Sequence, residues 1–129
     1  MWWPAFGLDA YEGWFGLDQY SPDNEVAARL GERYGERFDN TTPMNFLMTL
    51  TYDTARLFVE GLHRTTVLHG PGVKEGIERV RFLSCATGGP RTFISAGPYD
   101  HKVLKGDFFT YAKVDHGKWV YEGLFEPWV

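Results

Sequence analysis

The sequence predicts an α/β fold in a single unit spanning residues 1–129, and three observations carry this prediction. The apolar pattern indicates a short strand, then three helices, then a β-rich tail that begins near Arg91. At 129 residues and 14.8 kDa, the chain has the length of one domain. Hydrophobic residues make up 43% and charged residues 23%, which is typical of folded globular proteins and unlike disordered chains.

The first predicted strand covers residues 13–20, which are rich in aromatic side chains and are followed by Ser21-Pro22. Ser21 as N-cap and Pro22 at the first helical position predict that a helix begins here. The apolar residues of this helix recur every four positions, at Val26, Leu30, Tyr34 and Phe38. This spacing predicts a surface helix with one apolar stripe packed against a core.

A second helix is predicted over residues 44–62, after the cap-and-proline pattern of residues 40–43. Residues 40–42 also match a glycosylation sequon, but a helix cap is the better explanation of these residue types. The helix is apolar on nearly every side, which predicts burial in the interior. One strand before three helices leaves too little sheet to cover it, so we expect that part of the sheet is missing from this chain.

The third helix is predicted over residues 72–83, where Val73 and Ile77 face inward and residues 87–90 end the helix. The tail is expected to form strands at residues 92–96, 107–115 and 118–125. His116-Gly117 predicts a tight hairpin turn between the last two strands, because glycine tolerates a positive φ.

Charge and cysteine content exclude several classes of function. The net charge of −4 and the pI near 5.5 provide no basic field for nucleic acid, so we expect no nucleic-acid partner. The single cysteine, Cys85, forms no internal disulfide or zinc knuckle, and we expect it to be a small buried residue. The chain has neither an apolar run of membrane-spanning length nor a positively charged start typical of a signal peptide.

The sequence contains none of the common catalytic motifs that we considered. The four histidines lack HExxH or i, i+4 spacing and are expected to be solvated or to cap helices. The sequence contains no Walker lysine, GxGxxG or GxSxG motif. A small stand-alone α/β hydrolase using Asp100 and His101 is supported only by their adjacency, and we expect Asp100 to fix its turn while His101 stays solvated. A self-associating module, docking through the aromatic residues near the start, is a third possibility.

Seven segments carry a resemblance to a known family when they are taken in order. They are Tyr11-Glu12-Gly13, residues 33–38, 52–57, 72–80 and 88–95, residues 97–101 with 105–107, and residues 115–118. Together they resemble the C-terminal part of type I periplasmic solute-binding proteins, in the branch that binds branched-chain amino acids and amides. The resemblance covers residues 9–123.

This resemblance implies a receptor of two α/β lobes joined by a three-stranded hinge, which closes on a small solute and presents it to an ABC permease. Such receptors are periplasmic or at the cell surface, use no cofactor and are not enzymes. The chain would form part of a Rossmann-like lobe with a C-terminal β-hairpin, while the two N-terminal halves of the family would be absent. Residues 13–20 would then cross the hinge into the lobe, and the hairpin would cross back. Most of the binding pocket would be missing, so we expect weak solute binding or none.

The resemblance also suggests ligand-binding residues. In amino-acid binders of the family, an aromatic residue contacts the ligand at the start of the helix that leads into Tyr52-Asp53. Phe46 is our candidate, although strict register places Leu47 there, and helix periodicity equally allows both to be core residues. Trp2 and Trp3 follow a position where relatives supply an acidic ligand-binding residue. They are candidates to line the cleft, and exposed core aromatics are the simpler explanation.

Overall fold

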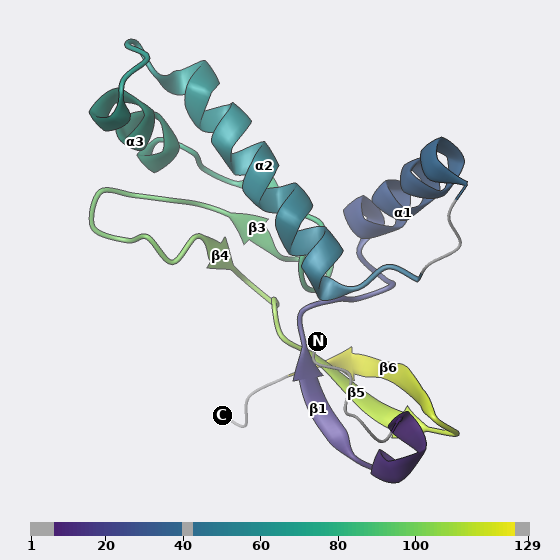
Figure 1. The fold of residues 1–129 in the computed structure, drawn as a ribbon. Helices are drawn as coiled ribbons and strands as arrows, with labels where there is room; N and C mark the ends of the chain where they lie inside the picture. The colour runs from purple at the N-terminus through teal and green to yellow at the C-terminus, as the bar shows by residue number, and fades with distance from the viewer. Residues whose placement is uncertain (1–6, 40–42, 126–129) are drawn as a thin grey trace.

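The computed structural model describes residues 7–39 and 43–125, and it confirms the predicted α/β class (Figure 1). Its elements in chain order are the 3-10 helix η1 (Leu8–Tyr11), β1 (Phe15–Asp18), α1 (Glu25–Phe38), α2 (Phe46–Arg64), α3 (Gly70–Glu78), β2 (Leu83–Ser84), β3 (Phe93–Ile94), β4 (Leu104–Lys105), β5 (Thr110–Asp115) and β6 (Lys118–Leu124). No helix in this described part of the chain is long and apolar enough to cross a membrane.

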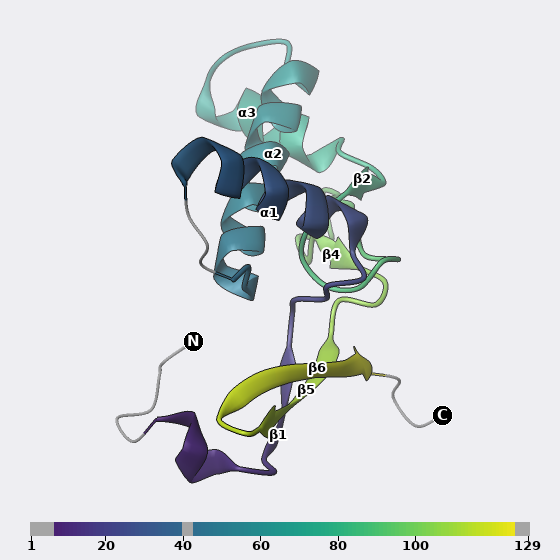
Figure 2. The same cartoon turned by 90° about the vertical axis from the view of Figure 1, so that its right-hand side faces the viewer.

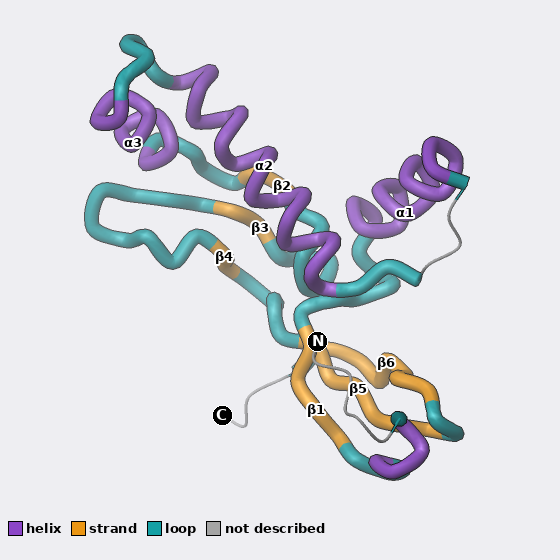
Figure 3. The backbone as a smooth tube through the Cα atoms, viewed as in Figure 1, coloured by secondary structure: helices purple, strands orange, loops and turns teal. Residues whose placement is uncertain are grey.

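The strands form two antiparallel sheets with separate positions in the molecule. One sheet has the order β1-β5-β6 and the other the order β2-β3-β4. Figures 1 and 2 both place β1, β5 and β6 apart from the three helices. β3 and β4 belong to the helical part, where Leu57 of α2 and Leu104 of β4 pack against the buried cluster that contains Ile94 of β3. Figure 3 shows that β2, β3 and β4 are short pieces within long loops. Within residues 7–39 and 43–125, the chain therefore crosses twice between the helical part and the β1-β5-β6 sheet.

Helix α1 begins three residues later than the sequence predicted. The N-cap is Asn24, whose Oδ1 accepts the N–H groups of Val26 (3.0 Å) and Ala27 (3.3 Å). Ser21 instead accepts the N–H of Asp23 in the turn before the helix. Asn24 also donates from Nδ2 to the carbonyl oxygens of the loop after β2, so tertiary contacts decide which residue caps the helix.

Helix α2 also begins later than predicted, because Asn45 is its N-cap and accepts the N–H groups of Leu47 (3.1 Å) and Met48 (3.3 Å). Residues 40–42, where the cap was expected, lie outside the described residues. The prediction that α2 is buried all round was wrong. One side, with Thr49, Asp53 and Gly61, is buried, but three large apolar side chains are about half exposed: Leu47 (51%), Phe58 (50%) and Val59 (48%).

Helix α3 is shorter than predicted and ends at Glu78. Phe82 adopts a left-handed backbone conformation (φ 50°) and is 76% exposed, which explains why the helix does not continue into Leu83. Helices α2 and α3 cross at two glycines, Gly61 and Gly76. A Cβ on Gly76 would overlap the Gly61 carbonyl oxygen, so this crossing requires glycine.

The core beneath these helices is small. Val80, Cys85 and Ile94 are fully buried, and four half-buried side chains pack against them: Leu57, Leu83, Val103 and Leu104. The burial of Cys85 confirms the prediction made for this thiol. Burial also raises the pKa of Cys85 to about 12, so the thiol stays protonated and unreactive.

The β-rich tail is confirmed, although its strands are shorter than predicted. The predicted strand over residues 92–96 is reduced to β3, and the strand predicted to begin at residue 107 begins at Thr110. The hairpin turn falls at His116 and Gly117, both with positive φ (50° and 68°), as the sequence predicted.

Candidate functional site

The candidate ligand-binding residues Phe46 and Leu47 lie in the first turn of α2. Phe46 is partly buried and Leu47 is 51% exposed. Besides the Asn45 cap, the Thr49 hydroxyl donates to the Phe46 carbonyl oxygen at 3.0 Å and fixes this turn. Figure 1 shows that this end of α2 is the end nearer to the β1-β5-β6 sheet. Trp2 and Trp3, the other two candidates, lie outside the described residues.

The two chain crossings near this end of α2 are joined through one loop. The Gly88 N–H donates to the Gln19 carbonyl on the first crossing (2.7 Å), and the Gly89 N–H donates to the Asp107 carbonyl on the second (2.9 Å). The Thr110 hydroxyl donates to the Tyr20 carbonyl at 2.9 Å and links the crossings directly. We call this hydrogen-bonded set, residues 19–20, 88–89 and 107–110, the junction.

Glycine is required in the junction at position 88. Its φ is 79°, and a Cβ there would lie 2.6 Å from the Cα of Phe108. Gly88-Gly89 was predicted to end the third helix, but α3 already ends at Glu78, and the pair instead brings two distant segments into contact.

Asp53 fixes the position of the junction loop relative to α2. The side chain is only 2% exposed, and its two carboxylate oxygens accept the N–H groups of Ala86 (2.9 Å) and Thr87 (2.7 Å). Sequence reasoning used Asp53 only as part of a resemblance and missed this role. The available signal was a carboxylate within the mostly apolar first half of the second helix, since a buried charge needs polar partners.

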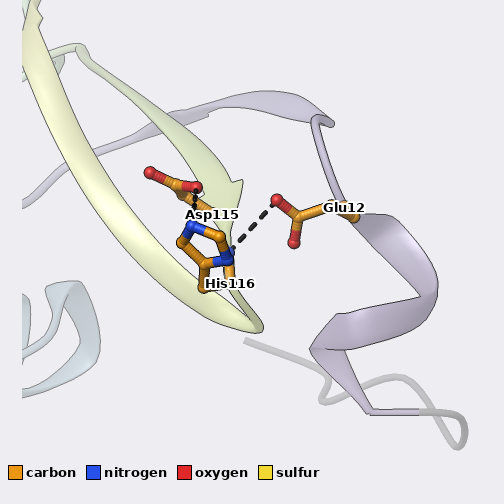
Figure 4. Close-up of side chains that lie close together, drawn as sticks. All are labelled: Glu12, Asp115 and His116. Atoms are coloured by element: carbon orange, nitrogen blue, oxygen red, sulfur yellow. Dashed lines mark hydrogen bonds and ion pairs between the residues drawn. The ribbon is translucent and has the colours of Figure 1, made fainter.

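A second side-chain cluster lies at the far end of the β5–β6 hairpin (Figure 4). Glu12 accepts the N–H groups of His116 (3.1 Å) and Gly117 (3.3 Å), and His116 Nε2 lies 3.7 Å from Asp115 Oδ1. These three side chains have the residue types of a metal site. However, both Glu12 oxygens already accept backbone N–H groups, and the His116 side chain is 94% exposed. The cluster therefore holds the hairpin turn in place.

Asp100 and His101 do not form a catalytic pair. Asp100 accepts hydrogen bonds from Lys105 Nζ (2.6 Å) and from the Lys102 N–H (3.1 Å), which confirms that it fixes its turn. His101 stays solvated, as expected, with its side chain 64% exposed, and its Nε2 also lies 2.8 Å from Glu78 Oε1. The two neighbours thus bind different partners.

Two other histidines confirm the expectation of solvated or capping roles. His69 is the N-cap of α3, where its Nδ1 accepts the Gly72 N–H at 3.0 Å. His63 is exposed in the last turn of α2, where a positive charge is favourable.

Glu78 gives the fold a predicted pH dependence. Hydrogen bonds from Lys74 (2.5 Å) and His101 (2.8 Å) hold the pKa of the Glu78 carboxyl below its usual range. A carboxyl whose pKa is depressed by folding adds stability above its unfolded pKa, about 4.3, and this contribution is lost as the pH falls through the folded value. We therefore expect stability to fall below about pH 4.3, and Glu78→Gln to flatten that part of the profile.

Urea denaturation at pH values from 3 to 7 measures this effect. Glu75→Gln is the matched control, because Glu75 lies on the same helix and its side chain is 62% exposed. An unchanged acid slope in Glu78→Gln, or an equal change in Glu75→Gln, would contradict the assignment.

The comparisons with known proteins bear on the fold. No protein-family model matches the chain, and no curated protein matches it. Among solved structures, the chain is similar to the leucine-binding protein LivK from Thermotoga maritima MSB8, with a TM-score of 0.73 and 22% sequence identity. The match covers 92% of this chain and 32% of that chain, so this chain spans about a third of the length of LivK. The chain therefore has the fold of part of a type I periplasmic binding protein, as the sequence predicted.

Proposed function

We propose that this chain is the C-terminal part of a solute-binding protein that captures a small solute such as a branched-chain amino acid or an amide. In this proposal the solute passes to an ABC permease, and the protein works in the periplasm or at the cell surface. The observation that carries the proposal is the fold shared with a leucine-binding protein over 92% of the chain.

The start of α2 supplies the part of the binding surface that this chain contributes. Phe46 and Leu47 present apolar surface at the end of the helix nearer to the junction. Such side chains suit the aliphatic part of a branched-chain amino acid, because each Å² of apolar surface removed from water contributes about 25 cal/mol. The junction, where two crossings lie together, is the position expected of a hinge.

A hydrolytic function gains no support from the contacts of Asp100 and His101. It rested on Asp100 and His101 acting together, and these side chains bind Lys105 and Glu78 instead. The neighbour LivK is likewise named as a binding protein. Self-association through exposed aromatic side chains stays a prediction, and Trp14 (63% exposed) and Phe15 (57%) are among the residues that support it.

The variant Phe46→Leu tests the role of the α2 start. We expect the 129-residue chain to bind leucine only in the millimolar range or more weakly, because it spans about a third of LivK. If Phe46 contacts the solute, the smaller side chain is expected to cost about 1 kcal/mol of binding, or about a fivefold loss of affinity, with little change in melting temperature. Ligand-observed NMR measures the affinity, and thermal melts measure the stability.

Phe58→Leu is the matched control, because Phe58 lies on the same helix three turns further on and is 50% exposed. It is expected to leave leucine binding unchanged. If Phe46→Leu kept the wild-type affinity and melted at a lower temperature, Phe46 would be a core residue and the proposed contact would be wrong.

A further inference from the structure

A groove between α1 and α2 is lined by residues that have no part in the proposed solute binding. Its volume is about 430 Å³, and we call it the arginine groove after four of its lining residues: Arg29, Arg33 and Arg37 of α1 and Arg56 of α2. Tyr34 and Tyr52 complete its polar and aromatic lining. Figure 2 shows α1 crossing in front of α2, which is how side chains of the two helices, at least 14 residues apart in the sequence, come to share one groove.

The arginine groove concentrates positive charge in a chain whose net charge is −4. No acidic residue lines it. Within residues 7–39 and 43–125, no carboxylate lies within 4 Å of a guanidinium nitrogen of these four arginines. Arg29, Arg33 and Arg37 follow one another at i, i+4 spacing, where like charges destabilise a helix. Glu25 stands one turn before Arg29 on the same row of the helix, and Glu32 and Glu36 lie on the neighbouring row. None of these three glutamates is among the lining residues.

Three of the four guanidinium groups make contacts within the chain, and one of them is Arg29, which donates from Nε to the Glu25 carbonyl oxygen at 3.3 Å. Arg56 donates from Nη1 to the Ser84 carbonyl oxygen at 2.6 Å and lies over the Tyr52 ring, 5.5 Å from its centroid. Arg37 lies over the Phe38 ring at 5.6 Å. An arginine carries five N–H donors in a rigid fork, so these contacts leave further donors for a ligand. Charges held in this way lose less conformational entropy when an anion binds.

The geometry restricts the ligand. The arginine fork matches phosphate and carboxylate groups, to which it donates two parallel hydrogen bonds. Successive arginines of α1 are about 6 Å apart along the helix axis, so a single small anion does not reach all three. A volume of about 430 Å³ lies in the range of sites for small organic ligands, about 300–1,000 Å³. A stripe about 12 Å long is too short for the extended basic surface that nucleic acid requires.

We propose that the arginine groove binds a small organic anion that carries at least two phosphate or carboxylate groups. One anionic group lies on the α1 arginines and the other near Arg56, while the ring of Tyr34 or Tyr52 contacts the body of the molecule. This site is separate from the α2 start, whose candidate residues are apolar.

The test is calorimetric titration of the 129-residue chain at low salt with two probes, ATP for phosphates and citrate for carboxylates. We expect one-site saturable binding of at least one probe, and the stronger of the two identifies the anionic group. Arg33→Gln is expected to weaken this binding about tenfold, since a hydrogen bond to a charged group contributes enough for such a change. Arg33→Lys, which keeps the charge and loses the fork, is expected to fall between Arg33→Gln and the wild type.

Arg91→Gln is the matched control, because it removes the same charge from an arginine outside the groove that pairs with Asp107. Equal weakening by Arg33→Gln and Arg91→Gln would show nonspecific attraction and overturn the proposal. Absence of saturable binding to both probes would also overturn it. If Arg33→Gln failed to fold by circular dichroism, Arg29→Gln would take its place. Leucine binding is expected to be the same in Arg33→Gln and the wild type, so failure of this proposal leaves the solute-binding proposal intact.

Discussion

Asp53→Ala is expected to destabilise the chain by about 3 kcal/mol or more. The substitution leaves the buried N–H groups of Ala86 and Thr87 without their acceptors, at 2.9 and 2.7 Å in the wild type. Each lost hydrogen bond to a charged group costs about 1.5–3 kcal/mol. With the loop no longer tied to α2, we also expect faster hydrogen exchange at Gly88 and Gly89. Urea denaturation followed by circular dichroism measures the free energy of unfolding.

The control is Thr54→Ala, one residue further along α2 and exposed. It removes a hydroxyl that bonds only to the Leu50 carbonyl of the same helix, and its expected effect is within about 0.5 kcal/mol. Asp53→Asn, which keeps one acceptor oxygen, is expected to fall between the two variants. Equal stability of Asp53→Ala and Thr54→Ala would contradict the role given to this carboxylate.

Gly76→Ala is expected to cost about 2–4 kcal/mol, because the new methyl group overlaps the Gly61 carbonyl oxygen and forces α3 away from α2. The gain in helix propensity, about 1 kcal/mol, opposes this loss but is smaller. A backbone oxygen cannot rotate away, so the whole crossing has to shift. Thermal melts of the purified variant give the change in stability.

Gly31→Ala separates this clash from the general effect of replacing a helical glycine. A Cβ on Gly31 would lie 2.9 Å from Cγ of Met44, a flexible side chain that has room to turn. We therefore expect Gly31→Ala to be neutral or to stabilise α1 by up to about 1 kcal/mol. A Gly76→Ala protein as stable as the Gly31→Ala protein would show that the two helices do not cross as closely as the structure has them.

The order of the three helices and of β1, β3, β5 and β6 could be predicted from the sequence pattern, whereas η1, the short strands β2 and β4, and the helix ends could not. Ser21-Pro22 has the composition of a helix start, yet Asn24 caps α1 because its amide also reaches the loop after β2, at Cys85. That contact joins residues 61 positions apart and leaves no local signal. The early end of α3 also had no local signal, because no neighbouring residue indicates the left-handed backbone conformation of Phe82.

The candidate sites differ in how far the sequence could reveal them. Phe46 and Leu47 came from a resemblance of the segment around Tyr52-Asp53, and the structure adds their exposure and their position. The arginine groove was not foreseen, because Arg56 joins the α1 arginines only through the crossing of two helices. Along the chain, these arginines look like an ordinary solvated helix face.

The most direct measurement for the central claim is an amide NMR titration of the 129-residue chain with leucine. We predict saturable shifts at residues 45–49, at the start of α2, and at Gly88 and Gly89 of the junction, with none in α3. We also expect Phe46→Leu to weaken these shifts and Phe58→Leu to leave them unchanged. Saturation without shifts at the α2 start, or shifts confined to α3 and the β5–β6 hairpin, would contradict the proposal that this chain contributes a solute-binding surface there.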